Sequence, residues 1–123
     1  TIIEILYLIN RVGKFSNYDV NDDQVERVIS YINTHYTEDI DLEILEKKFF
    51  TSKYYLCKIF RKATGLTIHD YIRRKRLSSV RELRHSGKSI SDAAMLSGFS
   101  DYSSFYRTYK KIMGHSPKED IEK

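Results

Sequence analysis

Apolar residues recur every three to four positions along most of this chain, a spacing typical of helices that bury one side. Short polar turns separate these stripes, and one proline and five glycines leave long segments uninterrupted. The pattern predicts an all-α protein of about seven helices. The expected helices are one from the cap residues 21–23 to Tyr36, then 42–49, 53–64, 67 to about 84, two within 90–113, and a short one after Ser116.

Residues suited to capping stand at the ends of these stripes. Gly65 follows the third of these stripes, at 53–64, and tolerates the left-handed conformation that ends many helices. Ser116 and Pro117 suit an N-cap and a first helical position. Side-chain oxygens that can accept a free backbone N–H at a helix start are offered by Asp41, Ser52, Thr67 and Ser89.

The first 22 residues differ from the rest. Residues 1–12 are apolar on almost every side, and a helix of that kind needs burial all round. We expect it to pack against an upstream region or a partner chain; the alternative is the cut end of a longer helix. Residues 13–22 are predicted to form a loop or linker. The start has no basic leader or cleavage site, which argues against a signal peptide.

One pattern occurs twice, about 49 residues apart. Each copy is a short helix, a tight turn and a second helix that ends in two cations and a glycine, which is typical of a helix-turn-helix. Glu46 and Ala94 match at an offset of 48, so the one-residue slip falls in the turn. The residues that match at an offset of 49 are Leu56, Phe60, Arg61, Lys62 and Gly65 with Phe105, Tyr109, Lys110, Lys111 and Gly114.

The repeat divides the chain into segments joined by one long helix. A helix of about 17 residues spans about 25 Å, so it can connect two motifs and hold them apart. We expect residues 1–22 to be an apolar helix and linker from an upstream region, 23–66 a first helix-turn-helix subdomain, 67–85 the connecting helix, and 86–123 a second helix-turn-helix subdomain.

The net charge of +4 conceals an asymmetry. Residues 1–41 contain three Lys or Arg and eight Asp or Glu, whereas residues 42–123 contain 18 and nine. Clustered positive charge favours a polyanion because binding releases condensed counterions. The alternative is a solvated basic surface, but its coincidence with the repeat favours nucleic acid.

Several other functions find no support in the composition. No apolar stretch reaches the length of a membrane span, and the single Cys57 allows neither an internal disulfide nor a multi-cysteine zinc cluster. That cysteine usage fits a cytoplasmic protein. The four histidines match no metal motif, and no serine–histidine–acid set or phosphate-binding glycine loop occurs. We therefore expect no cofactor, no metal and no enzymatic activity.

The outer face of the second helix in each motif offers candidates for reading DNA bases in the major groove. Lys58 and Arg107 are the best candidates for guanine, and Tyr54 and Tyr102 for thymine methyl groups. The alternative for each is an exposed residue without a function. The full set of expected base contacts is Tyr54, Cys57, Lys58, Tyr102, Ser103 and Arg107.

Cations and helix starts nearby are expected to contact phosphates, which fixes the position of the protein without reading sequence. Arg73 lies on the connecting helix, and a surface ion pair is its alternative role. Tyr55, Tyr71 and Tyr109 are expected in the core, and the inward stripe of the helix at 53–64 is expected to be Tyr55 or Leu56, Ile59, Phe60 and Ala63. The expected phosphate contacts are Ser52, Lys53, Arg61, Lys62, Arg73, Ser100, Lys110 and Lys111.

Two runs of residues recur at fixed spacing. The downstream run is Ile90, Ala93, Ala94, Gly98, Phe99, Phe105, Tyr109, Lys110, Lys111, Gly114, Ser116 and Pro117. The upstream run is Ser52, Tyr55, Leu56, Phe60, Arg61, Gly65, Tyr71, Ile72, Arg76 and Leu77. Together they resemble the AraC/XylS family of bacterial transcription regulators, over about residues 24–118. The departures from the family pattern are Glu46 and Val80 in place of alanine, Phe50 in place of glycine, and Asp120-Ile121 in place of an aromatic residue and an arginine.

The resemblance implies a seven-helix domain whose two helix-turn-helix units enter successive major grooves of double-stranded DNA. It carries base reading onto the six residues given above and places Arg73 at a phosphate. It also implies regulation of transcription initiation, contact with RNA polymerase, and a signal-sensing region or dimer partner attached through residues 1–12. Two alternatives are a protein-interaction module that uses residues 1–12 and the acidic stretch after them, and an enzyme. Family relatives with DNA-repair chemistry rely on several cysteines, whereas this chain has one.

Overall fold

The computed structural model describes residues 20–120, with side chains from Asp23 to Lys118. No strand occurs in this range, and no helix within it is long and apolar enough to cross a membrane. The apolar segment 1–12 and most of the expected linker lie outside the described residues. The helices are α2 (Val20–His35), α3 (Leu42–Phe49), α4 (Lys53–Thr64), α5 (Ile68–His85), α6 (Ile90–Leu96), α7 (Tyr102–Met113) and α8 (Pro117–Asp120).

The helix ends confirm most of the capping residues predicted from the sequence. Each of the four predicted N-caps accepts a hydrogen bond from a backbone N–H two or three residues further on, over 2.8 to 3.2 Å. Gly65 ends α4 in the left-handed conformation, with φ +78°. The first described helix begins at Val20, so residues 21–23 lie within its first turn rather than before it. Acidic residues there still favour the helix, because its N-terminus carries partial positive charge.

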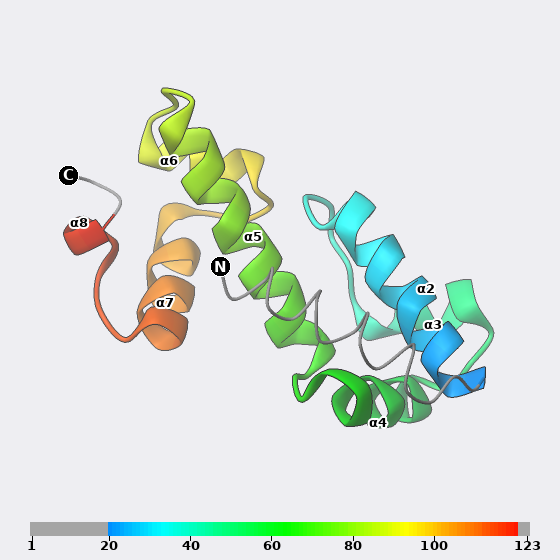
Figure 1. Cartoon of the computed structure of the whole chain (residues 1–123). Coiled ribbons are helices and arrows are strands. Elements are labelled where there is room, and N and C mark those ends of the chain that lie inside the picture. Colours follow the sequence, from blue (N-terminus) through cyan, green and yellow to red (C-terminus); the bar gives the residue numbers. More distant parts are fainter. Residues whose placement is uncertain (1–19, 121–123) are drawn as a thin grey trace.

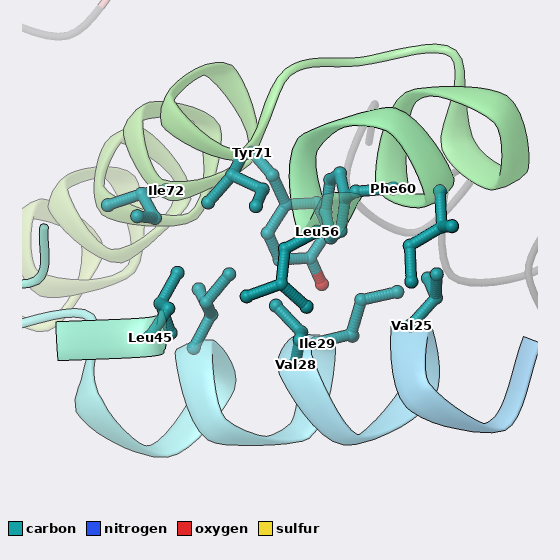
Figure 2. Packing of buried hydrophobic residues seen from close by; sticks show 11 residues of the cluster. Val25, Val28, Ile29, Leu45, Leu56, Phe60, Tyr71 and Ile72 are labelled. Atoms are coloured by element: carbon teal, nitrogen blue, oxygen red, sulfur yellow. The ribbon is translucent and has the colours of Figure 1, made fainter. Parts of the chain in front are cut away.

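Helices α2, α3 and α4 and the first half of α5 enclose the first cluster of buried residues. Its members are Val25, Val28, Ile29, Ile32, Leu45, Leu56, Ile59, Phe60, Ile68, Tyr71 and Ile72. Figure 2 shows Leu56 and Phe60 of α4 pointing toward α2 across this cluster. Tyr71 meets Phe60 edge to face at 5.7 Å between ring centroids, and its hydroxyl donates to Asn33 Oδ1 over 3.0 Å. An edge-to-face aromatic pair adds to the gain from burial.

The second half of α5 packs against α6 and α7 around the second cluster. Phe99 and Phe105 contact each other with ring centroids 5.5 Å apart, and the fully buried Ala93 and Ala94 let α6 approach closely. A buried hydrogen bond of 2.9 Å from Ser97 to Ser79 joins the end of α6 to α5. The members of the second cluster are Leu77, Val80, Ala93, Ala94, Phe99, Phe105 and Tyr109. Helix α5 therefore contributes to both clusters and runs between α4 and α7 (Figure 1).

Two expectations about the core need correction. Tyr55 was expected inside but is 40% exposed, because Leu56 takes the inward position on α4. Thr64, rather than Ala63, completes the buried stripe, and its hydroxyl donates to the Phe60 carbonyl over 2.8 Å. That internal hydrogen bond removes most of the cost of burying a hydroxyl. Tyr71 is buried, as predicted.

Phe50 follows α3 with φ +52° and is 95% exposed. A side chain in the left-handed region costs about 1–2 kcal/mol, which explains why glycine is common at this place in the family pattern. Val80, the other bulky departure, is fully buried in the second cluster. The last departure falls on Asp120, which ends α8, and on Ile121, which lies outside the described residues.

Candidate nucleic-acid interface

The outward face of α4 presents two of its three expected base contacts to solvent. Tyr54 is 78% exposed, and Lys58, one turn further on, is also exposed. Cys57 is half-buried and packs against the first cluster. Tyr54 and Lys58 thus form the accessible part of this face, while Cys57 lies at its inner edge.

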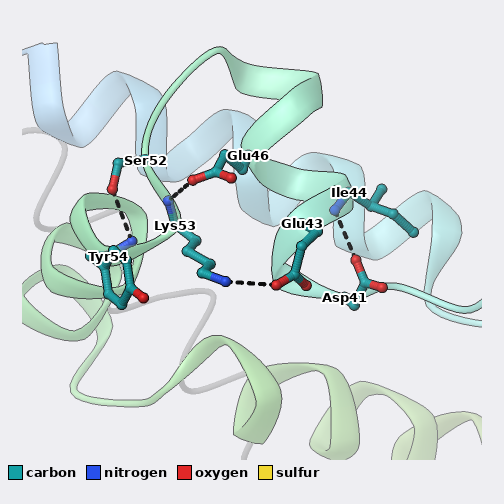
Figure 3. Close-up of polar contacts among 7 residues, drawn as sticks. All are labelled: Asp41, Glu43, Ile44, Glu46, Ser52, Lys53 and Tyr54. Atoms are coloured by element: carbon teal, nitrogen blue, oxygen red, sulfur yellow. Dashed lines mark hydrogen bonds and ion pairs between the residues drawn. The ribbon is translucent and has the colours of Figure 1, made fainter.

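The start of α4 is held to α3 by two carboxylates (Figure 3). Glu46 Oε2 accepts the backbone N–H of Lys53 over 2.8 Å, and Glu43 Oε1 lies 2.7 Å from the Lys53 ammonium. The next N–H of α4, that of Tyr54, donates to Ser52 Oγ over 3.2 Å. The Lys53 hydrogen bond lowers the pKa of the Glu43 carboxyl, and Glu43 in turn raises the pKa of Lys53.

These contacts give Glu46 a structural role. Its carboxylate satisfies an N–H that has no partner within the helix and complements the positive end of the helix dipole. An alanine at this position could do neither. The sequence marked Glu46 only as a departure from the family pattern. The signal that could have suggested its role is a carboxylate on one helix seven residues before the first residue of the next.

The outward face of α7 is arranged in the same way. Ser103 and Arg107 are exposed. Tyr102 is half-buried, with its ring centroid 5.6 Å from that of Phe105 and 6.4 Å from that of Tyr106. Ser103 and Arg107 are therefore the accessible pair on this helix, and Tyr102 offers only part of its ring.

The start of α7 is capped by the residue that follows Ser100. Asp101 is the N-cap, and its carboxylate accepts the Ser104 N–H over 2.7 Å. A carboxylate at this point occupies an amide that a phosphate would otherwise use and repels the phosphate charge. The Ser100 contact is thus less favoured by the local geometry than the cations of the same helix.

The predicted phosphate-contacting cations fall into two groups. Lys53 lies in the ion pair with Glu43, and Arg73 lies 3.2 Å from Asp70 on the same helix. The Arg73 pair matches the alternative role that the sequence left open, and exposed pairs of this kind contribute about 0–1 kcal/mol. The other four are exposed and show no ion pair with any described residue: Arg61, Lys62, Lys110 and Lys111.

Within the described part of the chain, no group of three or more His, Cys, Asp or Glu residues could hold a metal ion. The acidic residues near α4 are instead engaged with Lys53 and with helix N–H groups. Among the described residues, the exposed polar faces of α4 and α7, together with the cations at their ends, are the arrangement best suited to a ligand.

Comparison with protein families places most of these elements in a known group. A family described as "Helix-turn-helix domain" matches residues 45–123. An uncharacterised HTH-type transcriptional regulator of Staphylococcus aureus (strain COL) is 29% identical over 119 residues, which cover 96% of this chain and 16% of that protein. The HTH-type transcriptional activator RhaS of Enterobacter sp. (strain 638) is 28% identical over 120 residues, which cover 97% of this chain and 43% of RhaS.

Two solved structures have a similar fold. A protein of unknown function from Listeria innocua superposes with a TM-score of 0.71 and 30% identity, over 80% of this chain and 94% of that chain. The C-terminal domain of AraT, a response regulator from Geobacillus stearothermophilus, superposes with a TM-score of 0.72 and 26% identity, over 78% and 81%. The chain spans less than half the length of either curated relative, so it corresponds to one part of proteins of that kind.

Proposed function

The chain belongs to the AraC/XylS family of helix-turn-helix transcription regulators, and from this premise we propose that it binds double-stranded DNA sequence-specifically through two helix-turn-helix units. The units are α3–α4 and α6–α7. We propose that this binding, rather than catalysis, regulates transcription initiation.

The observation that carries the proposal is that α4 and α7 bury and expose equivalent positions. Lys58 and Arg107 stand 49 residues apart in sequence and are both exposed, and the same holds for Tyr54 and Ser103. Two buried positions match at the same offset, Leu56 with Phe105 and Phe60 with Tyr109. Two helices with equivalent polar faces, each packed on the long α5, suit two major grooves.

In this mechanism Lys58 and Arg107 donate to guanine O6 and N7, the commonest specific contact from cationic side chains. Tyr54 and Ser103 contact neighbouring bases, and Cys57 and Tyr102 add apolar contact at the edges of the two faces. Ser52, Ser100 and the predicted cations contact phosphates. Successive major grooves on one side of the duplex lie about 34 Å apart, so one chain covers a continuous site.

The wider organisation belongs to the same proposal. Residues 23–66 and 86–123 would act as two subdomains joined by 67–85. Regulation would require contact with RNA polymerase. Residues 1–12, which lie outside the described part, would attach a sensing region or a second copy of the chain.

The proposal is tested by selecting bound duplexes from a random pool at two salt concentrations. We expect enrichment of one bipartite site whose halves lie about one helical turn apart. Binding that enriches no sequence, or only one half-site, would contradict the two-unit mechanism.

Arg107→Ala should remove sequence preference at one position. Losing a bidentate guanine contact costs about 1–3 kcal/mol of discrimination, and the measurement is a repeat of the selection with the variant. Lys110→Ala is the matched control from the same helix, and it should weaken all sites evenly. An unchanged preference at every position in Arg107→Ala would remove this residue from the base-reading set.

Glu43→Gln should tighten DNA binding because it frees Lys53 and removes a negative charge beside α4. An exposed ion pair is weak, so we expect a gain in affinity of up to about fivefold, measured by fluorescence anisotropy. The control is Glu82→Gln, the same charge change at an exposed position of α5. An equal gain in both variants would show that net charge, and not Lys53, is responsible.

A further inference from the structure

The long helix α5 is joined to the loop after α2 by one arginine. Arg76 Nε donates to the Tyr36 carbonyl over 2.7 Å, and Arg76 Nη2 donates to the Glu38 carbonyl over 2.9 Å, across 40 and 38 residues of sequence. The neighbouring Lys75 places its ammonium 5.6 Å from the centroid of the Tyr36 ring. The Tyr36 carbonyl follows the last residue of α2, where helix carbonyls lack partners and attract cations.

The turn between α6 and α7 also contacts Arg76 and the Tyr36 carbonyl, through Gly98. Gly98 has φ +107°, and a Cβ built on it would lie 2.8 Å from Arg76 Nε, 2.8 Å from the Tyr36 carbonyl oxygen and 3.0 Å from Thr37 Cα. Real Cβ atoms do not approach so closely, and two of these three neighbours are backbone. The backbone of the second unit at Gly98 therefore lies directly against the backbone of the first at Tyr36 and Thr37, with the Arg76 guanidinium beside this contact. In Figure 1 the two loops approach each other beside α5.

The contact of Arg76 with Tyr36 and Gly98 lies beside the part of α5 that separates the two buried clusters. On α5 the first cluster ends at Ile72 and the second begins at Leu77, so Arg76 stands between them. Without it the two units would be connected chiefly through α5, and long helices are rarely straight. Burial lowers the pKa of the Arg76 guanidinium, and the nearby Asp39 carboxylate opposes that change. A partly desolvated cation that bridges two carbonyls holds them more firmly than an exposed one would.

We infer that Arg76 and Gly98 form an interlock that fixes α4 relative to α7, and so sets the spacing between the two half-sites that the chain accepts. The spacing role rests on the DNA-binding function proposed above. The interlock itself does not, because it concerns the free protein. Arg76 is in this sense a positioning residue for DNA recognition and makes no contact with DNA.

The first test measures the interlock without DNA. Spin labels are placed on cysteines at Lys62 of α4 and Lys111 of α7, both exposed, in a Cys57→Ser background, and the distance distribution is recorded by double electron–electron resonance. We expect one narrow distribution for the parent, and clear broadening in Arg76→Met and in Gly98→Ala. Arg81→Met, an exposed arginine of the same helix, should leave it narrow. A narrow, unshifted distribution in both junction variants would overturn the interlock.

The second test uses the selected bipartite site with one base pair inserted between its halves, which turns one half by about 34° relative to the other. The parent should lose affinity on the order of 10- to 100-fold, since one unit can no longer reach its bases. Arg76→Met should bind both spacings within about threefold of each other, and the milder Arg76→Lys should lie between them. Val80→Ala, which destabilises the second cluster away from the junction, should keep the parent's spacing penalty.

The outcomes of the two tests separate the two ideas. If the parent selects no site while the junction variants broaden the distance distribution, the DNA-binding proposal fails and the interlock stands. If a junction variant loses affinity equally at both spacings, Arg76 serves stability alone and the spacing role is overturned.

Discussion

Replacing Phe105 by alanine is expected to lower the free energy of unfolding by about 3–5 kcal/mol, the usual cost of truncating a buried phenylalanine. Phe105 is fully buried and its ring lies 5.5, 5.6 and 5.9 Å from those of Phe99, Tyr102 and Tyr109. The substitution removes the centre of the second cluster, and the helices around it cannot close the cavity without moving α7. Urea unfolding followed by circular dichroism measures the loss.

The chain provides a matched control in Phe50→Ala. The same side chain is lost there from a position that is 95% exposed, and the left-handed backbone is kept. Its free energy of unfolding should change by about 0.5 kcal/mol or less. Equal destabilisation by both substitutions would contradict the assignment of Phe105 to the core. Methyl NMR signals of Ile32 and Leu45 in Phe105→Ala would also report whether the first cluster persists when the second is disrupted.

Most of the fold could be predicted from the sequence because its determinants are local. Caps such as Asp41 and Ser52 act on amides two or three residues away, and Gly65 acts on its own backbone, so spacing alone located both ends of α4. The choice between Tyr55 and Leu56 could not be made locally. Both are apolar neighbours, and only packing against α2 decides which one is buried.

The site was predicted less completely because its polar contacts join separate elements. The exposed positions of Lys58 and Arg107 follow from helical periodicity once the buried stripe is known. The pairing of Lys53 with Glu43 depends on how α3 is placed against α4, and periodicity within one helix does not encode that placement. For the same reason the bridge from Arg76 to the loop after α2, 40 residues earlier, was not anticipated.

Replacing Arg61, Lys62, Lys110 and Lys111 together by glutamine should remove most of the salt dependence of DNA binding. Each phosphate neutralised by a cation adds about 0.9 to the slope of log affinity against log salt concentration. Six predicted cationic contacts give a slope of about −5, so the parent's affinity should fall on the order of 1000-fold between 50 and 200 mM salt. In the fourfold variant, a slope of about −2 would give a fall of only about tenfold.

A second fourfold variant separates local contact from overall charge. Lys47, Arg81, Lys88 and Lys118 are also exposed, and their replacement by glutamine gives the same net charge. This control should keep a slope near the parent's, because counterions are released only where cations meet phosphates. If the slope of log affinity against log salt concentration decreases equally in both variants, the four cations of α4 and α7 contribute no more to DNA binding than other exposed cations do.

The slope that remains in the first variant decides the roles of the two paired cations. Lys53 and Arg73 lie in exposed ion pairs with Glu43 and Asp70, which contribute little enough for a phosphate to compete with them. If both exchange their carboxylates for phosphates on binding, the residual slope should be about −2. A slope near zero would mean that Lys53 and Arg73 remain in their ion pairs with Glu43 and Asp70 and do not contact DNA. Because Glu43→Gln frees Lys53 alone, adding it to the fourfold variant should then restore a slope of about −1.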